Sequence, residues 1–130
     1  MFVFGEIDCR EGLLLAVEKD RYESVEAGID VCVGIWMKEA EKVVKEMGFS
    51  KVWVHPVVPV LNETRSVVCK YNLALKRAMD ACDWGSFMDC FDDMLAVAPK
   101  GDGYVLPKKY DLDGTHMHPD YLGLLEQFIR

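Results

Sequence analysis

The sequence predicts a single α/β domain, a three-layer α/β/α sandwich built on a parallel sheet. Short apolar runs at residues 2–7 and 51–56 are typical of buried strands, and a third short run lies at 86–90. Between these runs, apolar residues recur at three- and four-residue steps, which is the pattern of amphipathic helices. Strands that alternate with helices are expected to be parallel and joined by right-handed crossovers.

The first half of the chain predicts one strand and one long helix. The strand at residues 2–7 is followed by residues 8–22, which are expected to form a loop with about one helical turn. A helix at 24–47 has Ser24 as its N-cap and Gly48 as its C-cap. The residues that this helix is expected to bury are Val25, Ile29, Val33, Trp36, Ala40, Val43 and Met47.

The middle of the chain predicts a second strand and a second helix. The strand at 51–56 is apolar on both faces, which favours a central place in the sheet. Prolines that follow it exclude a helix until Asn62, the expected cap of a helix at about 63–82.

The last third predicts a strand at 86–90, a brief helix at 91–97 and a polar loop at 102–113. A final helix has His118 at its N-cap and Pro119 at its first position. This helix is expected to bury Leu122, Leu125 and Phe128. With no internal repeat or linker, residues 1–130 are expected to form one domain.

Composition and charge narrow the classes of function. The 130 residues are 51% hydrophobic and 28% charged, as in a globular domain. The net charge of −7 argues against nucleic acid or an anionic membrane as partner. No run approaches the roughly 20 apolar residues of a membrane span, and the first residues lack a signal peptide. Five cysteines without CxxC spacing indicate free thiols, so a cytoplasmic location is expected unless a leader precedes the chain.

The candidate catalytic residues are Asp113 and His116. A carboxylate three positions before an imidazole can fix the tautomer of a histidine that acts as a general base. The alternative is a solvated turn that Asp113 merely caps. His118 is expected to cap the last helix, and His55 to be a satisfied core histidine.

A second candidate region, the loop from Gly5 to Arg10, follows the first strand. Ligands bind α/β sheets beyond the carboxyl ends of strands, so Glu6, Asp8 and Arg10 are predicted to line a cleft. A salt bridge between Asp8 and Arg10 that only shapes the loop is the competing interpretation. Cys9, beside Arg10, is either an activated thiol or an ordinary loop cysteine.

An acidic and histidine-containing cluster near the C-terminus could also bind a divalent metal. Its Asp-x-Asp-Gly start is similar to a calcium loop, but the later glutamate and the twelve-residue spacing are absent. A metal site is therefore not expected. The cluster consists of Asp111, Asp113, His116, His118 and Asp120.

Three segments in this order resemble the C-terminal half of an SGNH (GDSL-type) hydrolase. They are Val-Trp-Val-His-Pro-Val-Val-Pro at 52–59, a helix with Tyr71-Asn72, and Asp113-Gly-Thr-His116 before a terminal helix. Residues 5–8, Gly-Glu-Ile-Asp, resemble the family's Gly-x-Asn-Asp block. The resemblance covers essentially the whole chain and implies a flavodoxin-like sheet and cofactor-free hydrolysis of esters or of acyl groups on lipids or carbohydrates.

The resemblance also assigns roles to residues. His116 becomes the base, Asp113 its orienting partner, and Gly5 the glycine of the third block. Ile7 stands where the family has an oxyanion asparagine, and removing one such donor costs about 10²–10³ in kcat. The family's Gly-Asp-Ser motif is absent, and none of the chain's serines is predicted on a nucleophile-like turn; they are Ser24, Ser50, Ser66 and Ser86.

We therefore expect an SGNH-like hydrolase, or the C-terminal portion of one, whose serine lies outside this chain. The alternative is a non-catalytic α/β binding or scaffold module for a polar ligand such as a sugar. In either case the family's first two strands are missing, which leaves residues 2–7 as an open sheet edge. Open edges pair with other strands, so a homodimer joined through the strand from Phe2 to Ile7, or a swapped arrangement, is expected.

Overall fold

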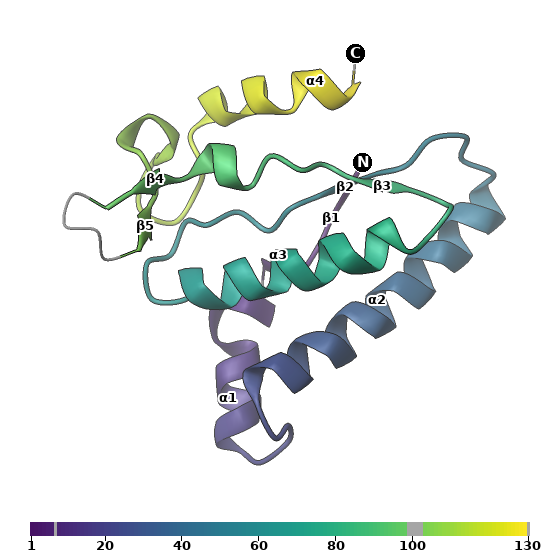
Figure 1. The fold of residues 1–130 in the computed structure, drawn as a ribbon, viewed down its shortest axis with the longest axis horizontal. Coiled ribbons are helices and arrows are strands. Elements are labelled where there is room, and N and C mark those ends of the chain that lie inside the picture. The colour runs from purple at the N-terminus through teal and green to yellow at the C-terminus, as the bar shows by residue number, and fades with distance from the viewer. Residues whose placement is uncertain (7, 99–102, 130) are drawn as a thin grey trace.

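Strands and helices alternate along the chain (Figure 1). The computed structural model describes residues 1–6, 8–98 and 103–129, and of Arg10 the backbone only. Three strands of two or three residues form one parallel sheet in the order β1-β2-β3. The predicted α/β fold with a parallel sheet is confirmed, although the strands are shorter than the apolar runs; they are β1 (Phe2–Val3), β2 (Trp53–His55) and β3 (Ser86–Phe87).

The long helix α2 (Val25–Met47) has the caps that the sequence predicts. Oγ of Ser24 accepts a hydrogen bond from the backbone N–H of Ala27 at 3.1 Å. Gly48 ends the helix with a φ of +65°, a conformation that glycine adopts at no steric cost. Local side-chain chemistry therefore fixes both ends of α2.

The start of helix α3 (Arg65–Asp80) corrects the sequence prediction. Asn62 is not its cap, because the chain turns once more before the helix begins after Thr64. The side chain of Arg65 reaches back and donates hydrogen bonds to the carbonyl oxygens of Pro59 at 3.1 Å and Val60 at 3.4 Å. These bonds hold the preceding segment against the helix, which moves the helix start two residues along the chain.

Residues 8–22, expected to be mostly loop, are largely helical. A π-helical turn η1 (Asp8–Gly12) leads into α1 (Leu13–Glu18). Leu13 is buried against α2, where a Cβ on Gly28 would lie 2.8 Å from its side chain. Close packing on α2 thus stabilises a helix that the local sequence pattern does not indicate. Among the described residues, no helix has the length and apolar character needed to cross a membrane.

The two faces of β2 are buried by different parts of the chain (Figure 1). Val54 belongs to the core beneath α2 and α3, which lie on one side of the sheet. Trp53 packs against Phe128 on the other side, and His55 packs against Tyr121, with ring centroids 5.6 and 5.8 Å apart. Successive side chains of a strand point to opposite faces, so the central strand is covered on both faces.

The C-terminal third differs most from the sequence prediction. The segment expected as a helix at 91–97 forms a 3₁₀ turn η2 (Asp92–Met94) and a strand, β4 (Ala96–Val97). This strand pairs with β5 (Tyr104–Val105) inside the expected polar loop, and a 3₁₀ turn η3 (Lys108–Tyr110) follows. Two-residue strands are too short to produce a visible alternation, so the sequence pattern does not reveal this hairpin.

The last helical segment begins where the sequence predicts. His118 is the N-cap and Pro119 the first residue of a 3₁₀ helix, η4 (Pro119–Leu124), followed by α4 (Glu126–Ile129). Leu125 is 3% exposed, as expected, whereas Leu122 is 50% exposed, so the prediction that Leu122 is buried was wrong. The 3₁₀ geometry explains this, since three residues per turn place different side chains inward than an α-helix would.

Candidate functional site: an Asp–His pair at the rim of the sheet

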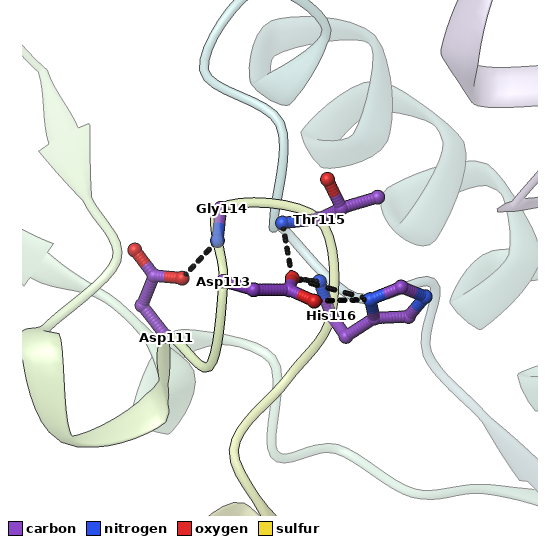
Figure 2. A network of polar contacts seen from close by, with 5 residues as sticks. All are labelled: Asp111, Asp113, Gly114, Thr115 and His116. Atoms are coloured by element: carbon purple, nitrogen blue, oxygen red, sulfur yellow. Dashed lines mark hydrogen bonds and ion pairs between the residues drawn. The ribbon is translucent and has the colours of Figure 1, made fainter.

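The predicted pair of Asp113 and His116 is formed (Figure 2). Oδ2 of Asp113 lies 2.8 Å from Nδ1 of His116, and Oδ1 lies 3.1 Å from the same nitrogen. A carboxylate accepts hydrogen bonds, so Nδ1 carries a proton, and in the neutral imidazole this leaves the lone pair on Nε2. Among the described residues Nε2 has no hydrogen-bond partner, and the His116 side chain is 66% exposed. The imidazole is therefore fixed at one nitrogen and open at the other.

Two aspartates fold the loop that carries the pair (Figure 2). Oδ1 of Asp111 accepts a hydrogen bond from the N–H of Gly114 at 2.7 Å. Oδ1 of Asp113 accepts hydrogen bonds from the N–H groups of Thr115 at 2.9 Å and His116 at 2.8 Å. Gly114 has a φ of +80°, which suits glycine. The sequence thus builds locally the turn that positions the imidazole.

The same hydrogen bonds lower the pKa of the Asp113 carboxyl. The His116 side chain is the largest cause, followed by the backbone N–H groups of Thr115 and His116. Hydrogen bonds to a carboxylate favour its charged form. Asp113 is consequently ionised at neutral pH, as a partner that orients an imidazole must be.

The loop lies at the rim where β1 and β2 end. Thr115, Glu6 and Cys9 line one small crevice, together with apolar residues of the segment after β2. The carboxyl ends of parallel strands are the usual place for ligands on α/β sheets. The crevice encloses about 10 Å³, which is about the space that one water molecule needs. The two predicted loops therefore meet, around a crevice too small for an ester substrate.

The residues predicted to bind at the rim lie in different places. Gly5 is buried with a φ of +93°, and a Cβ there would lie 2.6 Å from the Tyr71 ring. Glu6 is exposed and lines the crevice. Asp8 is not among the residues that line the crevice. Its carboxylate instead acts on Tyr71, whose pKa is raised first by burial and then by Asp8. The Arg10 side chain, and with it the alternative Asp8–Arg10 salt bridge, lies outside the described residues.

Cys9 is not an activated thiol. Its side chain is 1% exposed, and burial, followed by the Asp8 carboxylate, raises its pKa to about 12. A thiol with such a pKa is almost entirely protonated at neutral pH and is a poor nucleophile. The activated-thiol interpretation was therefore wrong, and the interpretation as an ordinary cysteine applies. All five cysteines are free.

The serines offer no nucleophile joined to His116. Ser24 has its hydroxyl oxygen engaged as the α2 cap. No hydrogen bond links any described serine to the imidazole, and the other three are exposed; they are Ser50, Ser66 and Ser86. The pair accordingly lacks a third member within the described part of the chain.

The other two histidines have structural places. Nδ1 of His118 accepts the N–H of Asp120 at 3.2 Å, which confirms its role as a helix cap. His55 is 1% exposed, and its Nδ1 lies 2.6 Å from the carbonyl oxygen of Pro56. Its Nε2 has no partner, so His55 is a core histidine but only half satisfied. Burial lowers the pKa of His55.

The residue that positions the rim segment after β2 was not among those predicted from the sequence. Asn72 is buried on α3; its Oδ1 accepts the N–H of Val57 at 2.7 Å, and its Nδ2 donates to the carbonyl of Val57 at 2.8 Å. This bidentate contact replaces the strand pairing that ends at His55. An amide on the inward face of an amphipathic helix was the available signal, since buried polar side chains need partners.

Within the part of the chain that the structure describes, no group of three or more His, Cys, Asp or Glu side chains is arranged to hold a metal ion. Two of the three aspartates of the cluster, Asp111 and Asp113, accept hydrogen bonds from backbone N–H groups of their own loop. Comparison with protein-family models, curated proteins and solved structures finds no match to the chain. The chemistry of the rim is therefore argued from its own geometry.

Proposed function

We propose that the chain carries the general-base half of an SGNH-like ester hydrolase site. In this proposal His116 is the base and Asp113 the partner that fixes its tautomer. The observation that carries it is the 2.8 Å contact between Oδ2 of Asp113 and Nδ1 of His116, with the imidazole exposed and Nε2 without a partner among the described residues. The resemblance of the Asp-Gly-Thr-His segment to the SGNH family supports the same roles.

The proposed chemistry is acyl transfer to a serine supplied from outside the described residues. The serine Oγ attacks the ester carbonyl while its proton passes to Nε2 of His116. Asp113 stabilises the imidazolium that forms. The proton then goes to the leaving alcohol as the ester C–O bond breaks, and water releases the acyl group by the same route. The substrate class is a small ester or an acylated carbohydrate or lipid.

The proposal extends to the fold and the assembly. The C-terminal segment would be the third layer of an SGNH-like, flavodoxin-like α/β/α sandwich that lacks its first two strands. In the described residues β1 pairs only with β2, and Val3 on it is 61% exposed. This open edge supports a homodimer joined through β1; Ile7, at the end of the predicted strand, lies outside the described residues. The free cysteines support a reducing, cytoplasmic location.

The test compares ester hydrolysis by the full-length gene product and by three variants. We expect His116→Ala to lower kcat by about 10²–10⁴-fold, the usual contribution of a general base. Asp113→Asn is expected to lower kcat as well, because the side chain loses its charge and its NH₂ group, in the place of Oδ2, would donate to Nδ1 and favour the wrong tautomer of His116. His118→Ala is the matched control and is expected to keep its activity, since His118 only caps η4.

A fluorophosphonate probe locates the nucleophile in the same protein. We expect labelling of a serine other than the four of this chain, and no stoichiometric labelling of the isolated chain. Stoichiometric labelling of the isolated chain at one of its own serines, or activity unchanged in His116→Ala, contradicts the proposal.

A second candidate function is a non-catalytic binding or scaffold module. Two observations favour it. The crevice of about 10 Å³ is too small for an ester substrate, and among the described residues no hydroxyl or thiol is hydrogen-bonded to His116. A gene product with neither esterase activity nor probe labelling would favour this module over the enzyme.

A further inference from the structure

A second pocket, larger than the crevice at Glu6 and Thr115, lies against α3. It has a volume of about 250 Å³ and lies between α3, the segment after β3, and β5. It shares no lining residue with the crevice at Glu6 and Thr115. Its position beyond the end of a parallel strand is where α/β sheets bind ligands. The pocket is thus a separate candidate site with room for a small organic molecule.

The walls of this pocket are mainly apolar and aromatic. Phe87 and Phe91 are each 8% exposed and belong to the core beneath, so they present firm apolar surface. Tyr104 on β5 and Leu73 on α3 also line it and are 60% and 56% exposed. Most of the contact that this pocket offers is therefore to the hydrocarbon part of a ligand.

The charged groups at the pocket leave one negative charge without a counterpart. Nζ of Lys76 lies 2.7 Å from Oδ2 of Asp89 and 4.0 Å from Oδ2 of Asp80, so its charge is already shared between two carboxylates. Asp92 lines the pocket, and its carboxylate has no ion-pair or hydrogen-bond partner among the described residues. An anionic ligand would meet repulsion here, whereas a cation would be attracted.

The Asp92 carboxylate lies near the thiol of Cys69, another residue that lines the pocket. Burial is the first cause that raises the pKa of Cys69, and Asp92 is the second, while Arg65 opposes them. Cys69 lines the same pocket. The negative field of Asp92 therefore reaches the surface that a ligand would contact.

We propose that this pocket binds a small organic cation, namely an ammonium group carried on an aromatic or branched alkyl body. The apolar body lies against Phe87 and Phe91, and the ammonium group lies beside Asp92. Tyr104 adds a ring face that attracts a cation. This inference uses none of the residues of the proposed hydrolase site, so each can fail without the other.

The test uses 2-phenylethylammonium, titrated into the ¹⁵N-labelled chain and followed by amide chemical shifts. Two probes of similar shape separate charge from apolar contact: 3-phenylpropionate is anionic and 2-phenylethanol is neutral. We expect saturable shifts at residues 69–76 and 87–95 with the ammonium probe. We expect the neutral probe to bind about fivefold more weakly, a difference of about 1 kcal/mol, and the anionic probe more weakly still.

Asp92→Asn and Asp93→Asn form a matched pair of neighbouring, exposed carboxylates. Asp93 does not line the pocket, so Asp93→Asn is expected to change affinity for the ammonium probe by less than about twofold. Asp92→Asn is expected to weaken it about fivefold or more, and Tyr104→Ala to weaken it as well, as an independent exposed variant. Equal binding of the cationic and anionic probes, no saturable shift with any probe, or equal effects of the two aspartate variants would overturn the proposal.

Discussion

Asp113 combines a local folding role with a proposed chemical one. The carboxylate accepts the backbone N–H groups of Thr115 and His116 as well as Nδ1 of the imidazole. The first two bonds shape the loop, and the third fixes the tautomer of His116. A solvated turn capped by aspartate and an oriented general base are therefore features of one geometry. The titration of Asp113 measures the strength of the third bond.

We expect His116→Ala to raise the pKa of Asp113 toward the ordinary value of about 3.9. The His116 side chain is the largest cause of the lowered pKa, whereas the two backbone N–H groups remain in the variant. Because folding lowers this pKa, the contribution of Asp113 to stability is present above its unfolded pKa and is lost as the pH falls through its folded pKa. ¹³C NMR titration of the aspartate carboxyl carbons measures the change.

The control for this titration is His118→Ala, whose partner is Asp120 and not Asp113. An Asp113 pKa that stays the same in His116→Ala would mean that the contact between the two side chains does not persist in solution.

At the scale of elements, α3 organises the rim more than the strands do. Asn72 holds Val57 from one position of the helix, and Arg65 holds the carbonyl groups of Pro59 and Val60 from another. The strands contribute only two or three paired residues each. Side-chain hydrogen bonds from a helix thus replace the ladder that longer strands would provide.

The turn after β1 depends on the absence of a side chain at Gly5. We expect Gly5→Ala to lower the free energy of unfolding by about 1–3 kcal/mol more than Gly103→Ala. Both glycines have nearly the same positive φ, +93° and +92°, so the strain of a positive φ is shared. Only at Gly5 would the new Cβ lie 2.6 Å from the Tyr71 ring, whereas nothing lies within 4 Å at Gly103.

Urea denaturation of the two variants measures the difference between their free energies of unfolding. Because both variants carry the strain of a positive φ, the difference reports the clash with Tyr71 alone. Equal destabilisation would show that the ring moves aside freely and that the close packing at Gly5 is not required.

At the scale of the whole molecule, the sheet is open at β1. Val3 points away from the helices that cover Phe2, and among the described residues no other strand pairs with β1 on its outer side. Unpaired backbone groups and an exposed apolar side chain together favour pairing with a second strand. Two copies that pair through the same edge, related by a twofold axis, would form the missing backbone hydrogen bonds and cover the exposed valine.

We expect light scattering to give the molar mass of a dimer for the wild-type chain. In the Val3→Lys variant the molar mass is expected to fall toward that of the monomer. Lysine on an edge strand opposes edge-to-edge pairing. Val97→Lys is the matched control, because Val97 is also exposed, at 69%, but lies in the β4–β5 hairpin. A monodisperse wild-type monomer would contradict the proposed dimer, as would dissociation of the dimer by Val97→Lys.

Local features were predictable because neighbouring residues produce them. The caps of α2 at Ser24 and Gly48 and the cap of η4 at His118 follow from side chains that bind the adjacent backbone. Val43 and Met47, which were expected to be buried, are 40% and 64% exposed. Val44, next to Val43, is 5% exposed and takes the inward place, so the periodicity indicated the wrong one of two adjacent valines. Met47 lies beyond Val44, the last buried residue of α2.

The sequence by itself determined the alternation of the three parallel strands with α2 and α3, the ends of α2, and the contact of Asp113 with His116, because each depends on a local pattern or on residues a few positions apart. Only the tertiary structure decided the burial of Cys9, the contact of Asn72 with Val57, and the pocket at Asp92. These features join segments far apart in the chain, and burial and hydrogen-bond partners there depend on how the layers pack, which no local pattern contains.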